Sequence, residues 1–404
     1  MSRDVALDRV HPEQITIPRG HALSRLPWIG ASIGAVGLVL SLALRAGDPK
    51  QFAFSWLVAF LFFLSLALGA LYFVLIHFAT QAGWGIVVRR LAENTMGTLP
   101  LFALLFVPVL LGMADLFPWV HGIAEGKDHV LMGKAPYLNR SFFVGRALVY
   151  FGLWSAIAMF YLRRSRRQDA TGDTAISIVL RRFSGPAIIV LAITQTFAAV
   201  DWIMSLDPAW YSTIFGVYWF AGSFVSFFAL VTLIVVTLRR AGLLTNIVGS
   251  EHFHDLGKLL FAFTVFWAYI GFSQYFLIWY GNIPEETIFF RHRLVGSWSA
   301  VSLLLAAGHF VVPFFFFMPR TIKRKPTLLA AGAAWMLAMH AVDIDWLVMP
   351  ALHPEGFAIG LPDVAAFLAV GGWFVAALSW MMQGSPLVPV GDPRLPESLS
   401  FENV

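Results

Sequence analysis

Long runs of apolar residues follow one another along the chain, and short polar stretches separate them. A helix needs about 20 mostly apolar residues to cross the hydrocarbon core of a bilayer. Because lipid offers the backbone no hydrogen-bond partners, such segments form helices rather than open strands. The pattern predicts an all-α polytopic membrane protein with ten transmembrane helices, over residues 26–44, 52–78, 98–121, 141–162, 183–206, 214–238, 256–280, 296–319, 326–350 and 362–383.

The composition agrees with this class of protein. Of the 404 residues, 58% are hydrophobic and only 13% are charged, whereas soluble domains carry about 25% charged residues. A soluble protein could not cover so much apolar surface. The chain is therefore expected to consist of an N-terminal tail (1–25), a ten-helix membrane domain (26–383) and a C-terminal tail (384–404).

The basic residues predict how the helices are oriented. Of the 28 lysines and arginines, 20 fall in segments on one side of the predicted spans and 8 on the other. The clusters "RRSRR" (163–167) and "IKRK" (322–325) lie on the richer side. The positive-inside rule then places both termini in the cytoplasm. The first span, which ends near "ALRA" (43–46), could be mistaken for a signal peptide. Its preceding tail and its length instead favour a retained helix.

Two predicted spans share a sequence pattern. "AVDWIMSLDP" (199–208) and "AVDIDWLVMP" (341–350) each place an aspartate at a similar depth. Asp115 lies at that depth in the third span, and Ser273 with Gln274 lies there in the seventh. The alternative is a chance likeness between short apolar strings. The coincidence of depth favours two four-helix bundles, residues 52–206 and 214–350, flanked by the first and last helices.

Several ionisable side chains are predicted at membrane depth. Burying such a group in a bilayer costs at least about 2.5–3.5 kcal/mol, so these groups usually mark a pathway or a binding site. Carboxyl groups in a low dielectric can hold a proton near neutral pH, and histidine titrates there unaided. The sequence therefore offers candidates for a proton relay: Asp115, Asp201, Asp343, Asp345, His309 and His340.

Structural alternatives exist for each of these candidates. An outer aspartate could simply pair with Arg146 or cap a helix end. His309 and His340 are the only histidines placed to hold a haem b between helices, but four-helix cytochromes usually repeat the ligand on each helix. Tyr218 lies in the outer part of the sixth span. Sequence alone fixes the depth of these groups and not the direction in which they point.

The seventh span carries an unusual number of polar groups for a membrane helix. Tyr269, Ser273 and Tyr280 fall on one helical face, which we expect to look into the bundle. The alternative is interhelical hydrogen bonding alone, at about 0.6–2 kcal/mol per contact. The inner end of this span, "EHFHDLGK" (251–258), could take up protons, dock a partner, or form a polar loop with an aspartate cap. The predicted proton route runs from here to the outer half of the ninth span, through His254, Asp255, Lys258, Thr264, Tyr269, Ser273, Gln274, His309, His340, Asp343 and Asp345.

The absence of cysteine narrows the chemistry of this chain. Disulfides, thiolate zinc sites, cysteine-ligated iron–sulfur clusters and covalently attached c-type haem are excluded. There is also no glycine-rich phosphate motif and no basic stripe interleaved with surface aromatics that would indicate nucleic acid. We expect no metal, no redox cofactor and no catalytic residue in the chain itself.

Three long strings closely resemble one protein family. They are "DWIMSLDPAWYSTIFGVYWFAGSF" (201–224), "FHDLGKLLFAFTVFWAYIGFSQYFLIWYGNIPEET" (253–287) and "RHRLVGSW" (291–298). The strings resemble the F subunit of alternative complex III, a bacterial quinol:electron-carrier oxidoreductase. More broadly they are similar to NrfD and polysulfide-reductase membrane subunits, which implies two four-helix bundles.

The resemblance also implies a setting and partners. It places the chain in a bacterial inner membrane, beside a multihaem cytochrome, an iron–sulfur protein and a homologous C subunit. Haem and iron–sulfur clusters are then expected in those partners, and a quinone or quinol is a possible ligand of this chain. The F subunit is described as quinone-binding by homology, and a proton path has been proposed in it. Two other functions stay open, a scaffold whose polar groups only hold helices together and a secondary transporter with a midplane site.

Overall fold

The computed structural model describes residues 11–126 and 129–402, and all the regular structure in these ranges is helical. Ten helical segments are long and apolar enough to cross a membrane. The predicted all-α class and the number of spans are thus confirmed. The ten segments are Ala22–Arg45, Pro49–Thr80, Ile86–Leu111, Arg140–Thr171, Ala175–Leu206, Phe215–Arg240, Ser250–Gly281, Trp298–Phe317, Pro326–Ala351 and Leu361–Met382.

Most of the spans are single helices, and the others are built from shorter pieces. The single helices are α3 (Leu26–Arg45), α4 (Pro49–Thr80), α11 (Arg140–Thr171), α12 (Ala175–Trp202), α13 (Phe215–Arg240), α14 (Ser250–Gly281), α19 (Pro326–Val348) and α20 (Leu361–Met382). The divided spans contain α5 (Ile86–Met96), α6 (Leu99–Leu105) and α7 (Val107–Leu111), or α16 (Trp298–Leu304), the π-helix η3 (Leu305–Val311) and α17 (Val312–Phe317). The 3₁₀ turns η1 (Ala22–Arg25), η2 (Met204–Leu206) and η4 (Met349–Ala351) extend α3, α12 and α19.

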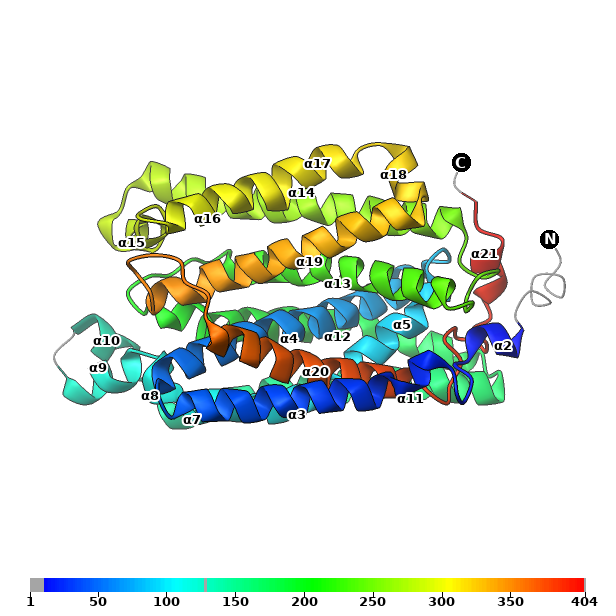
Figure 1. Ribbon diagram of the computed structural model, residues 1–404, viewed down its shortest axis with the longest axis horizontal. Helices are drawn as coiled ribbons and strands as arrows, with labels where there is room; N and C mark the ends of the chain where they lie inside the picture. The colour runs from blue at the N-terminus through cyan, green and yellow to red at the C-terminus, as the bar shows by residue number, and fades with distance from the viewer. Residues whose placement is uncertain (1–10, 127–128, 403–404) are drawn as a thin grey trace.

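Short helices lie at the two ends of the spans. They are α2 (Pro12–Ile15), α8 (Met113–Leu116), α9 (Trp119–Glu125), α10 (His129–Lys134), α15 (Pro284–Arg293), α18 (Arg320–Arg324) and α21 (Leu395–Leu399). In Figure 1 the first and last described helices, α2 and α21, lie at one end of the molecule with α18, while α8, α9, α10 and α15 lie at the other. We call these the terminal end and the opposite end. An even number of crossings requires both termini to share one end.

The third span begins twelve residues before its predicted start at residue 98. The predicted window excluded α5 because that helix carries charged residues. Those charges are buried and pair with one another: Arg89 Nε lies 3.1 Å from Glu93, and Arg90 Nη2 lies 2.5 Å from Asp169 in α11. Since the span ends at Leu111, Asp115 falls beyond it in α8.

Two helices form the interior of the helix assembly. Most of α4 is buried, and it contacts α3, α5, α12, α13, α19 and α20. The neighbouring α13 is also mostly buried and contacts α14 and α19. Apolar side chains lie on every side of both helices, as expected for helices without a lipid-facing side. A polar group that points toward α4 or α13 is therefore held away from lipid.

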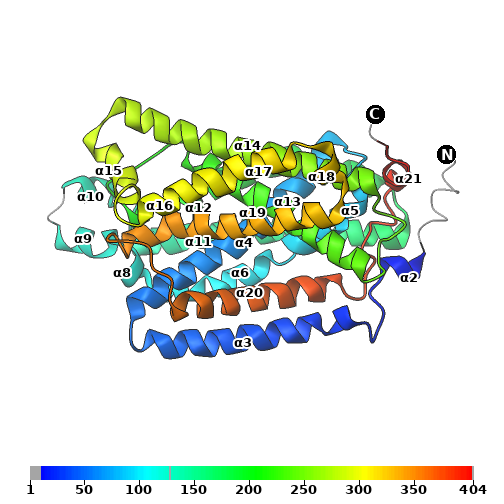
Figure 2. The same ribbon diagram turned by 45° about the horizontal axis from the view of Figure 1, so that its top comes forward.

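Close backbone approach joins the first and last spans. Figure 2 shows α3 and α20 side by side along one edge of the molecule. A Cβ atom on Gly37 would lie 2.3 Å from the Ala369 nitrogen, and one on Gly372 would lie 2.3 Å from the Gly34 nitrogen. Only glycine permits this separation, and small residues at such spacing are how membrane helices pack closely.

The two tails pack against each other and against α5 at the terminal end. The Leu387 amide donates to the Ile15 carbonyl at 2.6 Å. Asp392 accepts from the buried Arg89 at 2.6 Å, and the Ser398 hydroxyl donates to the Trp84 carbonyl at 2.6 Å. The C-terminal tail is therefore part of the folded structure up to residue 402.

Candidate functional site

Asp343 lies at the centre of a polar cluster buried between α13, α14 and α19. The residue is 1% exposed. Its Oδ1 accepts from the Tyr218 hydroxyl on α13, and its Oδ2 accepts from the Trp267 indole on α14 at 3.1 Å. Both donors are neutral, and no arginine or lysine among the described residues forms an ion pair with this carboxyl group. This environment suits a group that takes up and releases a proton.

His340 lies one turn before Asp343 on α19 and connects it to α4. Its Nδ1 is 3.9 Å from Asp343 Oδ2, and its Nε2 is 2.8 Å from the Ser65 hydroxyl. The imidazole is fully buried, and Nδ1 has no hydrogen-bond partner among the described residues. A Cβ on Gly222 would lie 3.1 Å from the ring. Glycine at this position leaves room for the imidazole beside Asp343.

His309 lies in the π-helix η3 and packs against Trp267, with the two ring planes tilted by 52°. The two ring centroids are 3.8 Å apart. The sequence explains the π-helix, because Pro313 has no amide hydrogen and its ring clashes with the carbonyl four residues earlier, which belongs to His309. Single-turn π-helices are frequent at functional sites. Neither nitrogen of this buried ring has a hydrogen-bond partner within the described part of the chain.

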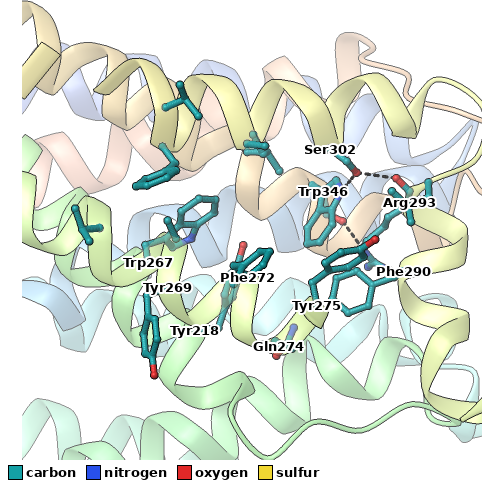
Figure 3. Close-up of a pocket in the computed structure, with 18 residues that line it drawn as sticks. Tyr218, Trp267, Tyr269, Phe272, Gln274, Tyr275, Phe290, Arg293, Ser302 and Trp346 are labelled. Carbon is teal, nitrogen blue, oxygen red and sulfur yellow. Dashed lines mark hydrogen bonds between the residues drawn. The ribbon is translucent and has the colours of Figure 1, made fainter. Parts of the chain in front are cut away.

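A cavity of about 570 Å³ adjoins this cluster (Figure 3). It lies between α14, α15, α19 and the span formed by α16, η3 and α17, and its walls are mostly apolar and aromatic. Tyr218 and Trp267, which both donate to Asp343, form part of its wall. Asp343 itself therefore sits directly behind the wall of the cavity. Such a shape suits a flat, largely apolar ligand with a few polar atoms.

Arg293 lies at the end of the cavity that is farthest from Tyr218 and Trp267. Figure 3 places Arg293, Ser302 and Trp346 at the end opposite Tyr218 and Trp267. The guanidinium donates to the carbonyls of Trp346, Phe289 and Leu347 at 2.8–2.9 Å. Burial lowers the pKa of Arg293 to about 9, which leaves it protonated at neutral pH. Within the described residues its hydrogen bonds go to these neutral carbonyls, and the carboxylate of Asp207 partly offsets the effect of burial on its pKa.

The polar face predicted on the seventh span points away from the bundle. Tyr269 is 63% exposed and Tyr280 is 77% exposed, and Ser273 is only partly buried. The expectation that this face looks inward is wrong. α14 is a peripheral helix, and the face that it buries instead carries Thr264, Trp267, Ile270, Gln274 and Ile278. Tyr269 lines the outer wall of the cavity, with its hydroxyl directed away from Trp267 in Figure 3.

Two other polar residues of α14 are inside the protein but already have partners. The Thr264 hydroxyl donates to the Leu260 carbonyl of its own helix at 2.7 Å. Gln274 lines the cavity, and its Oε1 accepts from the Ser212 hydroxyl at 3.0 Å. Gln274 therefore belongs to the cavity, whereas Thr264 shows only local backbone bonding.

The structure does not connect the inner-end residues of α14 to the Asp343 cluster. His254 and Asp255 are buried in the first turns of the helix, and Asp255 pairs with Lys258. At 1.5 Å per residue, His254 and Trp267 are roughly 20 Å apart along the axis. Leu256 and Leu260 are buried on the face between them. The described side chains supply no continuous polar path over that distance.

The two aspartates predicted in the first bundle lie apart from this site. Asp201 is fully buried and accepts from Arg146 Nε and Nη2 at 2.8 and 2.9 Å and from the Tyr150 hydroxyl at 2.8 Å. This is the pairing with Arg146 that the sequence left open. Asp115 is partly exposed in α8. Asp201 thus has a fixed cationic partner, which Asp343 lacks.

Asp345 faces a second cavity on the other side of α19. This cavity of about 330 Å³ is also lined by Ser55 and Asp363. Asp363 accepts from the Ser55 hydroxyl at 2.6 Å, while Asp345 Oδ2 has no hydrogen-bond partner in the described ranges. The two residues Asp343 and Asp345 therefore do not form one cluster, although they are two positions apart. A helix turns by about 200° over two residues, which separates their side chains.

The packing of the two histidines does not support the haem alternative. His340 is held by Ser65 and by the close approach of Gly222, and His309 packs against Trp267. Neither histidine lines the large cavity. A haem plane between them would have to displace Trp267, which is bonded to Asp343.

Three residues of the site were not predicted from the sequence. Trp267 lies within the seventh span, but one tryptophan among so many aromatic residues did not indicate that its N–H takes part in the site. Arg293 follows a predicted span and was not expected to fold back against α19. Ser65 is one of several hydroxyl residues in an apolar helix. Only knowledge of which faces meet could have identified them.

The described part of the chain is thus all-helical, with ten helical segments suited to crossing a membrane and a buried polar cluster around Asp343 beside an apolar cavity. Comparison with known families finds none that matches this chain, and no curated protein matches it.

Proposed function

We propose that this chain is a cofactor-free integral membrane subunit of a quinol:electron-carrier oxidoreductase of the alternative complex III type. In this proposal the large cavity receives a quinone or quinol ring, and Asp343 exchanges the proton that accompanies its chemistry. The proposal rests on one observation, that two residues lining the cavity also contact Asp343. Tyr218 and Trp267 both line the cavity and donate to Asp343.

The cavity's chemistry supports a quinone-type ligand. Its aromatic and aliphatic walls suit a ring with an isoprenoid tail, and its polar groups are few. Tyr275 and Gln274 line the middle, and Arg293 holds the far end. Exposed apolar residues at the mouth, including Phe272 at 64%, would admit the ligand from lipid.

The proton-handling part of the proposal rests on groups within reach of Asp343. A relay needs members at hydrogen-bond distance or one water apart. His340 is 3.9 Å away, a distance that a small rearrangement or a water could close, and Ser65 extends the series toward α4. Buried polar atoms without partners often bind ordered water. Both ring nitrogens of His309 and Nδ1 of His340 have no hydrogen-bond partner among the described residues. We therefore include water molecules at these nitrogens in the proposed relay.

The proposed family, location and partners follow from the resemblance of residues 201–298 to the F subunit of alternative complex III. The chain would belong to the NrfD-like subunits and lie in a bacterial inner membrane with both termini in the cytoplasm. Its partners would be a multihaem cytochrome, an iron–sulfur protein and a homologous C subunit, which hold the haem and the clusters. The contacts among α4, α5, α11 and α12, and among α13, α14, α17 and α19, support an arrangement in two four-helix bundles.

Photolabelling tests the quinone site directly. An azido-quinone added to the purified complex should label peptides of α14 or η3 that line the cavity. Ala306→Trp places an indole in the cavity and should abolish this labelling. Ala300→Trp is the matched control, because this exposed residue lies on α16 outside the cavity. Equal labelling in both variants would contradict the assignment.

Purification under mild detergent tests membership of the complex. A tagged chain should bring down a multihaem protein, seen by its haem absorbance, and the preparation should oxidise quinol. Deleting the chain should impair quinol oxidation by membranes. A chain that purifies alone and catalyses solute exchange would support the transporter instead. An assembled complex without quinone labelling and with unaltered Asp343→Asn turnover would support a scaffold.

A further inference from the structure

A second site of distinct chemistry lies at the terminal end of the molecule. A cavity of about 240 Å³ opens between the C-terminal end of α4, the N-terminal end of α12 and the C-terminal tail. Three arginines line it, Arg89, Arg181 and Arg394, against the single carboxylate of Asp392. The site is therefore positively charged and suited to an anion.

The three arginines differ in what already holds them. Arg89 pairs with Asp392 at 2.6 Å, and Arg394 pairs with Glu397 at 2.6 Å. Arg181 has no carboxylate partner among the described residues. Its guanidinium faces the side-chain amide of Gln81, whose oxygen accepts from Arg181 Nε at 3.2 Å once the amide is turned so that the oxygen faces the guanidinium. Arg394 also donates to the backbone carbonyl of Gln81. Gln81 thus contacts the guanidinium groups of both Arg181 and Arg394 on one side of the cavity. Of the three arginines, Arg181 is the one whose charge is not balanced by a carboxylate among the described residues.

Neutral donors complete the lining. The Ser177 hydroxyl accepts from Gln168 Nε2 at 2.7 Å, so its own hydrogen is available to donate. His77 is 4% exposed, and its Nε2 has no hydrogen-bond partner within the described ranges. Guanidinium groups, a hydroxyl and an imidazole together match the acceptor oxygens of a phosphate group.

The position of the cavity indicates where such a phosphate would come from. It lies where the spans meet the arginine-rich end, which is the depth of lipid headgroups. Ile178 lines the cavity and is 61% exposed, and Ile189 and Ile193 continue the exposed apolar side of α12 at 62% and 53%. Acyl chains could lie along this side while the headgroup occupies the cavity. Basic pockets between membrane helices on the cytoplasmic side bind anionic headgroups in this way.

We propose that this cavity binds the phosphate group of an anionic phospholipid, with Arg181 as the principal charge. The ligand class is a phosphodiester such as that of phosphatidylglycerol. The site is independent of the quinone cavity and of the proton-handling role of Asp343.

Thermal unfolding of the purified protein in detergent, followed by fluorescence of its 15 tryptophans, tests the proposal. Phosphatidylglycerol in mixed micelles should raise the unfolding temperature, and phosphatidylcholine should not. In Arg181→Gln the half-maximal phosphatidylglycerol concentration should rise about fivefold, which corresponds to roughly 1 kcal/mol. Arg182→Gln is the control, because this adjacent exposed arginine does not line the cavity.

The remaining outcomes distinguish lipid from free phosphate and from a general charge effect. An equal loss in both variants, or an equal response to phosphatidylcholine, would overturn the site. A shift reproduced by inorganic phosphate alone would reject the lipid as its source. Native mass spectrometry of the wild-type protein after partial delipidation gives a second reading. One retained phosphatidylglycerol per chain is expected, and none would contradict the proposal whatever the stability of the variants.

Discussion

Buried aspartates in this protein differ by the groups that contact them. Asp201 receives three hydrogen bonds, two of them from the Arg146 guanidinium. Asp343 receives two, both from neutral donors. A paired carboxylate is fixed in its charged form, while one with neutral donors can change its protonation without leaving a cation unpaired. We therefore propose a structural role for Asp201 and proton exchange for Asp343.

Asp201→Asn is expected to destabilise the protein. The change leaves the Arg146 guanidinium buried without its counter-charge, and breaking one side of a buried pair costs about 3 kcal/mol or more. The unfolding temperature in detergent should fall clearly below that of the wild-type protein. Asp115→Asn serves as the control, since this partly exposed residue should leave the temperature unchanged. A wild-type unfolding temperature for Asp201→Asn would remove the structural role assigned to the pair.

At the scale of helices, hydropathy predicted what crosses a membrane and failed where charges are internally paired. The ten spans follow from apolar length, which is a local property of the sequence. The start of the third span was misplaced because Arg89 and Glu93 neutralise each other inside the protein. The facing of Tyr269 and the separation of Asp343 from Asp345 could not be predicted, since both depend on which helices meet. The depth of a residue in the membrane follows from its position in a local apolar run, whereas the direction of its side chain is set by which helices pack together.

Packing of α3 on α20 gives a prediction at the same scale. Gly37→Leu forces a side chain into the backbone of Ala369, where a Cβ alone would approach to 2.3 Å. Overpacking of this kind costs about 1–3 kcal/mol, and the two helices should separate in part. A disulfide engineered between the helices should form more slowly, and the unfolding temperature should fall. Gly152→Leu in α11 is the control, because a Cβ atom added there would meet no side chain and no other helix within 4 Å. Equal unfolding temperatures for the two variants would contradict the role given to this close approach.

At the scale of the whole molecule, both ends of the chain share one end of the helix assembly. The 20-to-8 division of basic residues predicts that this end lies in the cytoplasm. Alkaline phosphatase fused after Val404 should therefore be inactive, and the same enzyme inserted after the exposed Pro354 should be active. The opposite pattern of activity would reverse the orientation and would move the phosphate-binding cavity to the outer leaflet.

The central claim is that Asp343 exchanges protons during quinol turnover, and its most direct test is proton release by the reconstituted complex. Asp343→Asn keeps the size of the side chain and removes its titratable group. A complex carrying this variant should assemble with its haem content unchanged. In liposomes containing a pH-sensitive dye, this variant should oxidise quinol at least about tenfold more slowly, and the release of the protons that the oxidation sets free should slow to the same extent. Wild-type turnover together with a wild-type proton yield in Asp343→Asn would contradict the account.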